Sequence, residues 1–194
     1  MWLDACRAYQ KFVLPPQGRS AGNLESSLPN LQQFLAFTKV LNAQRVLVLG
    51  CGNGYEVEWL RGQGLDAVGV TLMQEEADQA KTLYPAANVV RGDMHDLSIF
   101  KDGEFDAVFA REVLEHSPAF MLVVGEIWYV LRPGGLLYFT FPSARWDADP
   151  QHATVISERT VLATLPKVGF DFASPLLVTP YGNFTVTSVF AQKR

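Results

Sequence analysis

Residues 46–54 run Val-Leu-Val-Leu-Gly-Cys-Gly-Asn-Gly, an apolar segment followed by three glycines at alternate positions. An apolar run of this kind predicts a strand that is buried on both faces. Glycines after a strand let the backbone turn tightly and approach a ligand without a Cβ in the way. A helical pattern follows over residues 55–62, so the turn leads into a helix N-terminus, which attracts carboxylates and phosphates. The stretch therefore predicts either a nucleotide-cofactor loop or an ordinary strand-to-helix turn.

The spacing of the glycines discriminates between cofactors. The dinucleotide-binding fingerprint is Gly-x-Gly-x-x-Gly after a strand. Here the third glycine, Gly54, comes one residue early, and Tyr55 stands where that fingerprint has glycine. The arrangement Gly50-x-Gly52-x-Gly54 instead resembles the first motif of the class I S-adenosylmethionine-dependent methyltransferases.

Further segments resemble that family in the same order along the chain. A second strand over residues 66–71 ends about twenty residues after the glycine loop, where nucleotide-binding α/β folds hold the ribose hydroxyls. The other matching segments are Arg91-Gly92-Asp93-Met94 after a strand at 88–90, Arg111-Glu112-Val113-Leu114-Glu115-His116 after a strand at 105–110, and Leu131-Arg132-Pro133-Gly134-Gly135 before a strand at 136–141. The resemblance covers residues 43–142.

The resemblance implies a Rossmann-like, doubly wound α/β fold. Its seven-stranded sheet has parallel strands and one antiparallel strand in a C-terminal hairpin. The whole chain, 1–194, is then expected to be a single methyltransferase domain. Within it we expect an N-terminal lid over the acceptor at 1–28, a cofactor-binding core at 43–142, and a substrate-side loop, helix and hairpin at 143–194.

The resemblance also implies S-adenosylmethionine as cofactor and a set of residues that bind it. The methionine end should lie on the glycine loop, the ribose at the end of the second strand, and the adenine against the third-strand motif. The backbone after the fourth strand should pass the methionine end. In this order the expected residues are Leu49, Gly50, Cys51, Gly52 and Gly54; Thr71, Leu72 and Gln74; Asp93, Met94 and His95; Ala110 and Arg111.

Two positions depart from the family pattern. Val48 stands where many members have an acidic residue, and Thr71 stands where most have Asp or Glu. A threonine at this point resembles the cyclopropane-fatty-acid-synthase branch, in which a nearby Gln helps to bind the cofactor. Gln74 and Glu76 are the candidates for that role here. The alternatives are therefore a lipid-modifying enzyme of the cyclopropane-synthase type and a non-catalytic binding module. A nicotinamide oxidoreductase is disfavoured by the glycine spacing.

Methyl transfer from a sulfonium is an in-line displacement, and positioning can supply about 7–11 kcal/mol of its catalysis. A general base is needed only when the acceptor arrives protonated and weakly nucleophilic. The sequence assigns no catalytic residue. His116 and His152 are candidate bases, because each follows a strand at the edge of the sheet where ligands collect. For His116 a structural role is the preferred interpretation, and His152 could instead contact the substrate or be an ordinary loop residue.

Composition limits the remaining function classes. A net charge of −4 with scattered Lys and Arg disfavours nucleic acid as a partner, so the expected partner is a small-molecule acceptor. Two cysteines and three histidines show no metal-ligand spacing, so no metal is expected. No apolar stretch is long enough to span a membrane and no signal peptide is evident, which favours a cytoplasmic location. The oligomeric state is not indicated.

Three local expectations concern the ends of the chain. Pro29 should open a helix that continues to about Leu41. Ser157 should cap a helix reaching residue 168, with Leu162 and Leu165 facing inward. Two strands should follow, over 170–179 and 184–192.

Overall fold

The fold is described from a computed structural model, which defines residues 24–142, 151–181 and 184–194. The expected lid over residues 1–28 therefore lies outside the described residues, except for its last five positions. Most of the loop expected after residue 142 also lies outside them.

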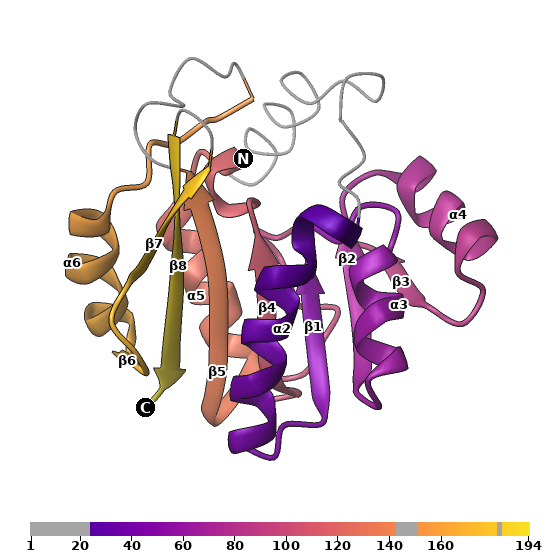
Figure 1. The fold of residues 1–194 in the computed structure, drawn as a ribbon, viewed down its shortest axis with the longest axis horizontal. Coiled ribbons are helices and arrows are strands. Elements are labelled where there is room, and N and C mark those ends of the chain that lie inside the picture. Colours follow the sequence, from indigo (N-terminus) through magenta and orange to yellow (C-terminus); the bar gives the residue numbers. More distant parts are fainter. Residues whose placement is uncertain (1–23, 143–150, 182–183) are drawn as a thin grey trace.

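Within the described segments, eight strands form one mixed sheet in the order β3-β2-β1-β4-β5-β8-β6, with β7 also paired to β8 (Figure 1). The strands β1 to β5 are parallel, and β8 runs antiparallel to β5. The strand bounds are β1 Arg45–Leu49, β2 Asp66–Thr71, β3 Asn88–Arg91, β4 Phe105–Arg111, β5 Leu131–Pro142, β6 Phe170–Phe172, β7 Leu177–Tyr181 and β8 Phe184–Lys193.

The strands β6 and β7 share one position in the sheet. β6 pairs with residues 191–193 of β8 and β7 with residues 184–188, while β5 occupies the opposite edge of β8. The sheet therefore has seven positions, of which only β8 is antiparallel to the rest. This is the Rossmann-like methyltransferase arrangement expected from the sequence.

Helices cover both faces of the sheet (Figure 1). Alternate residues of β1 point to opposite faces, because side chains alternate along a strand. Val46 and Val48 pack with α2, α3 and α4, and Leu47 and Leu49 belong to the cluster that contains α5 and α6. The helix bounds are α2 Leu24–Val40, α3 Tyr55–Gly62, α4 Gln74–Leu83, the short 3₁₀ helix η1 Leu114–His116, α5 Phe120–Val130 and α6 Glu158–Val168.

Three of the expectations for the chain ends are corrected by the structure. The helix α2 begins at Leu24 and contains Pro29 inside it, so this proline does not mark the start. Leu162 is 52% exposed, because it lies on the outer side of α6, whereas Leu165 is buried as expected. The segment 170–179 is divided between two strands, β6 and β7. The Ser157 cap is confirmed, since its hydroxyl accepts from the backbone N–H of Thr160 at 3.1 Å.

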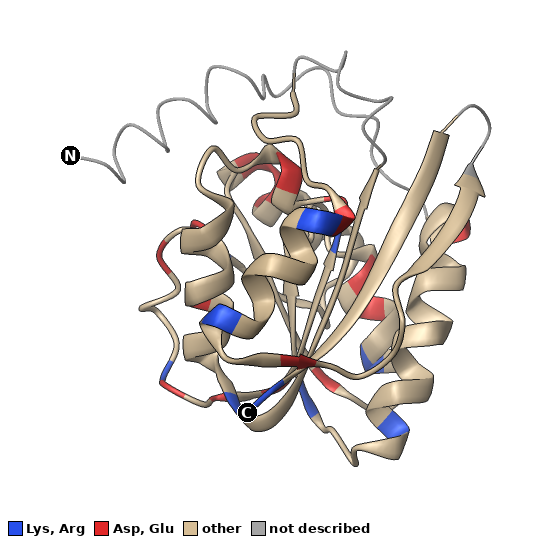
Figure 2. Ribbon diagram, turned by 90° about the vertical axis from the view of Figure 1, so that its left-hand side faces the viewer, with Lys and Arg blue, Asp and Glu red and all other residues tan. Residues whose placement is uncertain are grey.

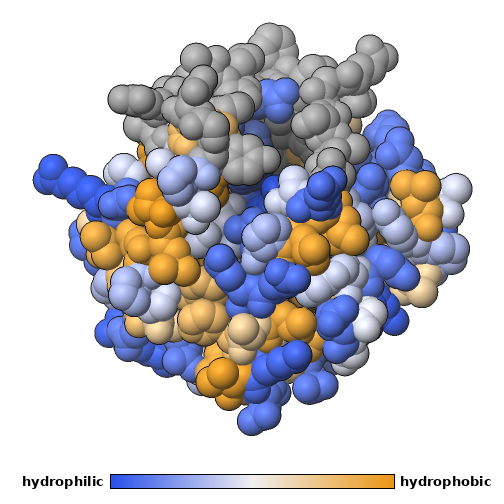
Figure 3. Space-filling model, in the orientation of Figure 1, coloured by the Kyte–Doolittle hydropathy of each residue, from blue (hydrophilic) through white to orange (hydrophobic). Residues whose placement is uncertain are grey.

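The surface of the described residues is mixed in character. In the view of Figure 2, Lys and Arg positions are spread over the surface among Asp and Glu positions, and α6 carries both Arg159 and Lys167. Figure 3 shows apolar side chains gathered over α6 and β7, where Leu162, Leu177 and Val178 are each at least 41% exposed. Among the described residues, no helix is both long and apolar enough to cross a membrane.

Candidate cofactor and acceptor site

The glycine loop connects the carboxyl end of β1 to the N-terminus of α3. Gly50, Gly52 and Gly54 have φ values of 67°, 52° and 85°, in the left-handed region that favours glycine. A Cβ on Gly50 would lie 2.5 Å from a methyl carbon of Val113, so this position cannot hold a larger residue without movement. A Cβ on Gly52 would meet nothing within 4 Å. The loop thus presents bare backbone to open space beside a helix N-terminus, which fits an anionic cofactor group.

Cys51 turns its side chain away from that space. It is 2% exposed, and its Sγ would lie 2.6 Å from a Cβ added at Gly69 of β2. Its backbone N–H donates to the carbonyl of Val70 at 3.0 Å. Burial raises the pKa of the Cys51 thiol well above its usual range. Cys51 can therefore contribute to cofactor binding only through its backbone. Its side chain packs the loop against β2.

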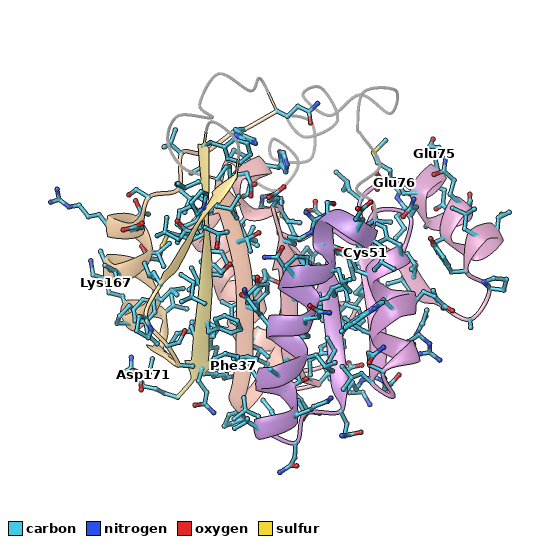
Figure 4. The ribbon with its side chains drawn as sticks, in the orientation of Figure 1. Phe37, Cys51, Glu75, Glu76, Lys167 and Asp171 are labelled. Carbon is cyan, nitrogen blue, oxygen red and sulfur yellow. The ribbon has the colours of Figure 1, made fainter. Side chains whose placement is uncertain are left out.

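The end of β2 combines a hydroxyl with a carboxylate from α4. Thr71 is buried, and its Oγ1 donates to the Oε2 of Glu76. Figure 4 shows Glu76 close to the Cys51 loop, at the start of α4. Gln74, the other residue expected to help here, is exposed and donates to Asp78 at 3.0 Å along the helix surface. Glu76 thus places a carboxylate next to Thr71, at the position where most family members have an acidic residue on the strand itself. Leu72, the next residue, is half-buried.

Asp93, after β3, is held by a chain of hydrogen bonds. Its Oδ1 accepts from the backbone N–H of His95 at 3.0 Å and lies 2.7 Å from His95 Nδ1. The other ring nitrogen, Nε2, lies 2.7 Å from the hydroxyl of Ser117, which accepts from the N–H of Ala119 at 2.9 Å. Asp93, His95 and Ser117, and Met94 beside them, are buried. The expected adenine residues are therefore fixed to the loop that follows η1.

Arg111, at the end of β4, is anchored to the start of α3. Its Nε donates to Glu56 Oε1 at 2.8 Å, and its terminal nitrogen donates to the Tyr55 hydroxyl at 2.7 Å. Burial raises the pKa of the Glu56 carboxyl and raises that of Tyr55 to about 12. Burial alone would lower the pKa of Arg111, but the charges of Glu56, Tyr55 and Glu112 and the hydrogen bond to Glu56 together outweigh burial, so the net shift is upward.

The Arg111 pairing joins the end of β4 to the start of α3, where the methionine end of the cofactor is expected. Leu49 and Ala110, also expected there, are buried at the ends of the adjacent strands β1 and β4. From the sequence, only the backbone of Arg111 is expected to contribute to the site. The acidic residue Glu56 in the first turn of α3 indicates that a basic side chain could pair with it. The sequence alone does not identify Arg111 as that partner.

His116 and His152 lie together, with ring centroids 5.2 Å apart. The potential ligand atoms of these two residues and Glu115 all lie within 4.8 Å of one another. The grouping arises because the loop holding His152 folds back on η1. The expectation that no metal binds rested on spacing along the sequence, which cannot detect a ligand set assembled in this way.

The fold and the glycine loop together define a doubly wound protein that binds a nucleotide-type cofactor. The family described as "Methyltransferase domain" matches residues 47–139, the region that contains this loop. An S-adenosylmethionine-dependent methyltransferase from Archaeoglobus fulgidus has the same fold, with a TM-score of 0.72 and 17% identity; the match covers 89% of this chain and 95% of that one.

Curated relatives agree with the family. The ubiquinone biosynthesis O-methyltransferase of Thiobacillus denitrificans is 29% identical over 137 residues, 69% of this chain and 58% of that protein. The phthiotriol/phenolphthiotriol dimycocerosates methyltransferase 1 of Mycobacterium ulcerans is 34% identical over 123 residues, 56% of this chain and 43% of that protein. The chain thus spans about half the length of these curated relatives.

The segment 47–139 of this chain belongs to the class I S-adenosylmethionine-dependent methyltransferase family. S-Adenosylmethionine is the cofactor that this family implies, and the nicotinamide alternative is set aside. The loop fits the cofactor, because bare backbone at Gly52 faces open space at a helix N-terminus.

Proposed function

We propose that this chain transfers a methyl group from S-adenosylmethionine to a small-molecule acceptor. The observation that carries the proposal is the loop of three left-handed glycines, with open space at Gly52, at the start of α3. The names of the relatives, which include ubiquinone biosynthesis and phthiotriol dimycocerosates, support a small-molecule acceptor. The acceptor itself and its reacting atom are left open.

The bound cofactor would supply an activated methyl on a sulfonium, and the chain would supply binding and alignment. We assign the carboxylate end of the cofactor to the backbone from Gly50 to Gly54, where helix N–H groups point. We assign the ribose to the pair of Thr71 and Glu76, since a carboxylate can accept from two hydroxyls. We assign the adenine to Asp93. Holding the donor rigidly in line with an acceptor is worth up to about 7–11 kcal/mol.

No base is required for an acceptor that arrives as an anion or a free amine. For a protonated hydroxyl, His116 and His152 remain the candidate bases. His116 Nδ1 lies 2.9 Å from the carbonyl of Gln151, so Nδ1 donates there and Nε2 is the nitrogen that can accept a proton. The His116 ring is half-buried beside His152, near the end of β4.

The first experiment is calorimetric titration of the purified chain with S-adenosylhomocysteine, with NAD as the control ligand. Micromolar binding of S-adenosylhomocysteine alone supports the proposal, and transfer of labelled methyl to a panel of phenols, amines and lipids then identifies the acceptor. A folded protein that binds the cofactor but methylates none of the panel would favour the binding-module alternative. Absence of binding would overturn the proposal.

The pair formed by Thr71 and Glu76 gives a specific prediction. Glu76→Gln should weaken S-adenosylhomocysteine binding by about 3–10-fold, because an amide replaces a carboxylate that accepts from ribose hydroxyls. The matched control is Glu75→Gln, the neighbouring carboxylate, which is exposed and points away from the loop (Figure 4). Equal affinities of the two variants, measured by calorimetry, would remove Glu76 from the ribose site.

A further inference from the structure

Glu115, His116 and His152 form a three-residue cluster at the carboxyl edge of the sheet. One ligand atom from each lies within 4.8 Å of the other two. Glu115 is 2% exposed, and the two imidazoles are half-buried. Nitrogen and carboxylate donors in this combination suit zinc and similar transition ions. The residues come from η1 and from the loop before α6, which are distant in sequence.

Backbone hydrogen bonds hold these two segments together, in addition to the contact that the His116 ring makes with Gln151. The N–H groups of Ala153 and Thr154 both donate to the carbonyl of Glu115, at 2.9 and 3.0 Å. The Thr154 hydroxyl donates to the carbonyl of Ser117 at 2.6 Å. His152 is therefore carried to its position beside His116 by hydrogen bonds from the residues that follow it. A preformed scaffold of this kind lowers the cost of assembling a ligand set.

The hydrogen bond of His116 also fixes which ring nitrogen can act as a ligand. Its Nδ1 lies 2.9 Å from the carbonyl oxygen of Gln151, which can only accept, so Nδ1 carries the proton. In the neutral ring Nε2 then holds the lone pair. Metal-binding histidines are commonly oriented by such a bond from the second ring nitrogen to a backbone carbonyl.

We propose that Glu115, His116 and His152 bind a divalent transition ion of the zinc type. At about 2.0–2.2 Å from each donor, a tetrahedral ion needs donor atoms about 3.4 Å apart. The donor atoms lie within 4.8 Å of one another, so they need to approach by up to about 1.4 Å. Three protein ligands leave a fourth position open for water or for an oxygen of the acceptor. Magnesium and calcium fit less well, because they prefer all-oxygen ligand sets.

The test titrates the chelator-treated full chain with Co²⁺ and follows the visible absorption that cobalt gains from nitrogen and oxygen ligands. Calorimetry with Zn²⁺ provides the affinity. We expect one ion per chain, and His152→Ala should weaken binding by at least about tenfold. His116→Ala should do the same. Neither cofactor nor acceptor is present, so a failure here is distinct from a failure of the proposed methyl transfer.

The matched control is Glu158→Gln, an exposed carboxylate in the first turn of α6, which should bind the ion as tightly as the wild type. Thermal melting without metal establishes that each variant is folded. Because Glu115 is buried, the half-buried His152 is the decisive position. A folded wild type that takes up no Co²⁺ would overturn the proposal, as would a His152→Ala variant that binds it with unchanged affinity.

Discussion

Arg111→Met is expected to lower the free energy of unfolding by about 3–5 kcal/mol near pH 7, because it leaves the Glu56 carboxylate buried without its cation. Methionine keeps much of the length of the arginine side chain and removes the charge. Glu56 and Arg111 are 7% and 13% exposed in their side chains, so water cannot replace the lost partner readily. Urea unfolding followed by circular dichroism measures the effect.

The destabilisation should depend on pH in a defined direction. Burial raises the pKa of Glu56 in the folded protein above 4.5, and Arg111 opposes that rise. Without Arg111 the folded pKa goes higher still, so the folded state binds more protons than the unfolded state above pH 4.5. Stability is then lost as pH rises through this window. The deficit relative to wild type should be smaller at about pH 5 than at about pH 8.

A double variant separates the cost of the unpaired charge from the cost of lost packing. Glu56→Met combined with Arg111→Met removes both charges, and apolar replacements of buried pairs are often nearly neutral. The double variant should therefore be more stable than Arg111→Met alone. If the losses in free energy of unfolding of the two single variants simply add in the double variant, Arg111 does not stabilise the buried charge of Glu56.

Asp93→Ala is expected to weaken S-adenosylhomocysteine binding by about 10–100-fold, the range for losing a hydrogen bond to a charged group. The carboxylate is buried and oriented by His95, so little rearrangement is needed before it can accept from adenine. Calorimetry on the purified variant measures the affinity. Unchanged affinity in a folded protein would overturn the adenine assignment.

Because Asp93 also orients His95, its variants need two comparisons. Asp93→Asn keeps an oxygen that can accept from His95 while removing the charge, and it should show an intermediate loss with a melting temperature close to wild type. Asp78→Ala removes an exposed carboxylate on α4 and should leave the affinity unchanged. A loss of affinity that follows only the melting temperature would point to a structural role for Asp93.

Much of the fold follows from local patterns in the sequence. The apolar run at residues 46–49 favours a buried strand whatever elements pack against it. The three glycines after it adopt the left-handed backbone conformation, which is unfavourable for other residues. The Ser157 cap is equally local. Turn chemistry and periodicity act over a few residues, which is why the order of strands and helices in the cofactor-binding core could be predicted.

Elements whose position depends on distant partners could not be predicted in the same way. Leu162 fits a helical pattern, yet only the packing of α6 against the sheet determines that it faces outward. The break between β6 and β7 depends on how each pairs with β8. Pro29 lies inside α2, whose first turn begins at Leu24.

The family and the backbone of the cofactor loop could be predicted from sequence, because both reside in short contiguous motifs. The side chains that meet at the site became known only from the folded chain. Glu76 is already a candidate from its place near Thr71, but only the fold brings Arg111 at the end of β4 to Glu56 at the start of α3. His152 joins Glu115 and His116 because backbone hydrogen bonds fold its loop onto η1. Contacts of this kind form between segments that are distant in the sequence and close in space, so they cannot be predicted from the spacing of residues along the chain.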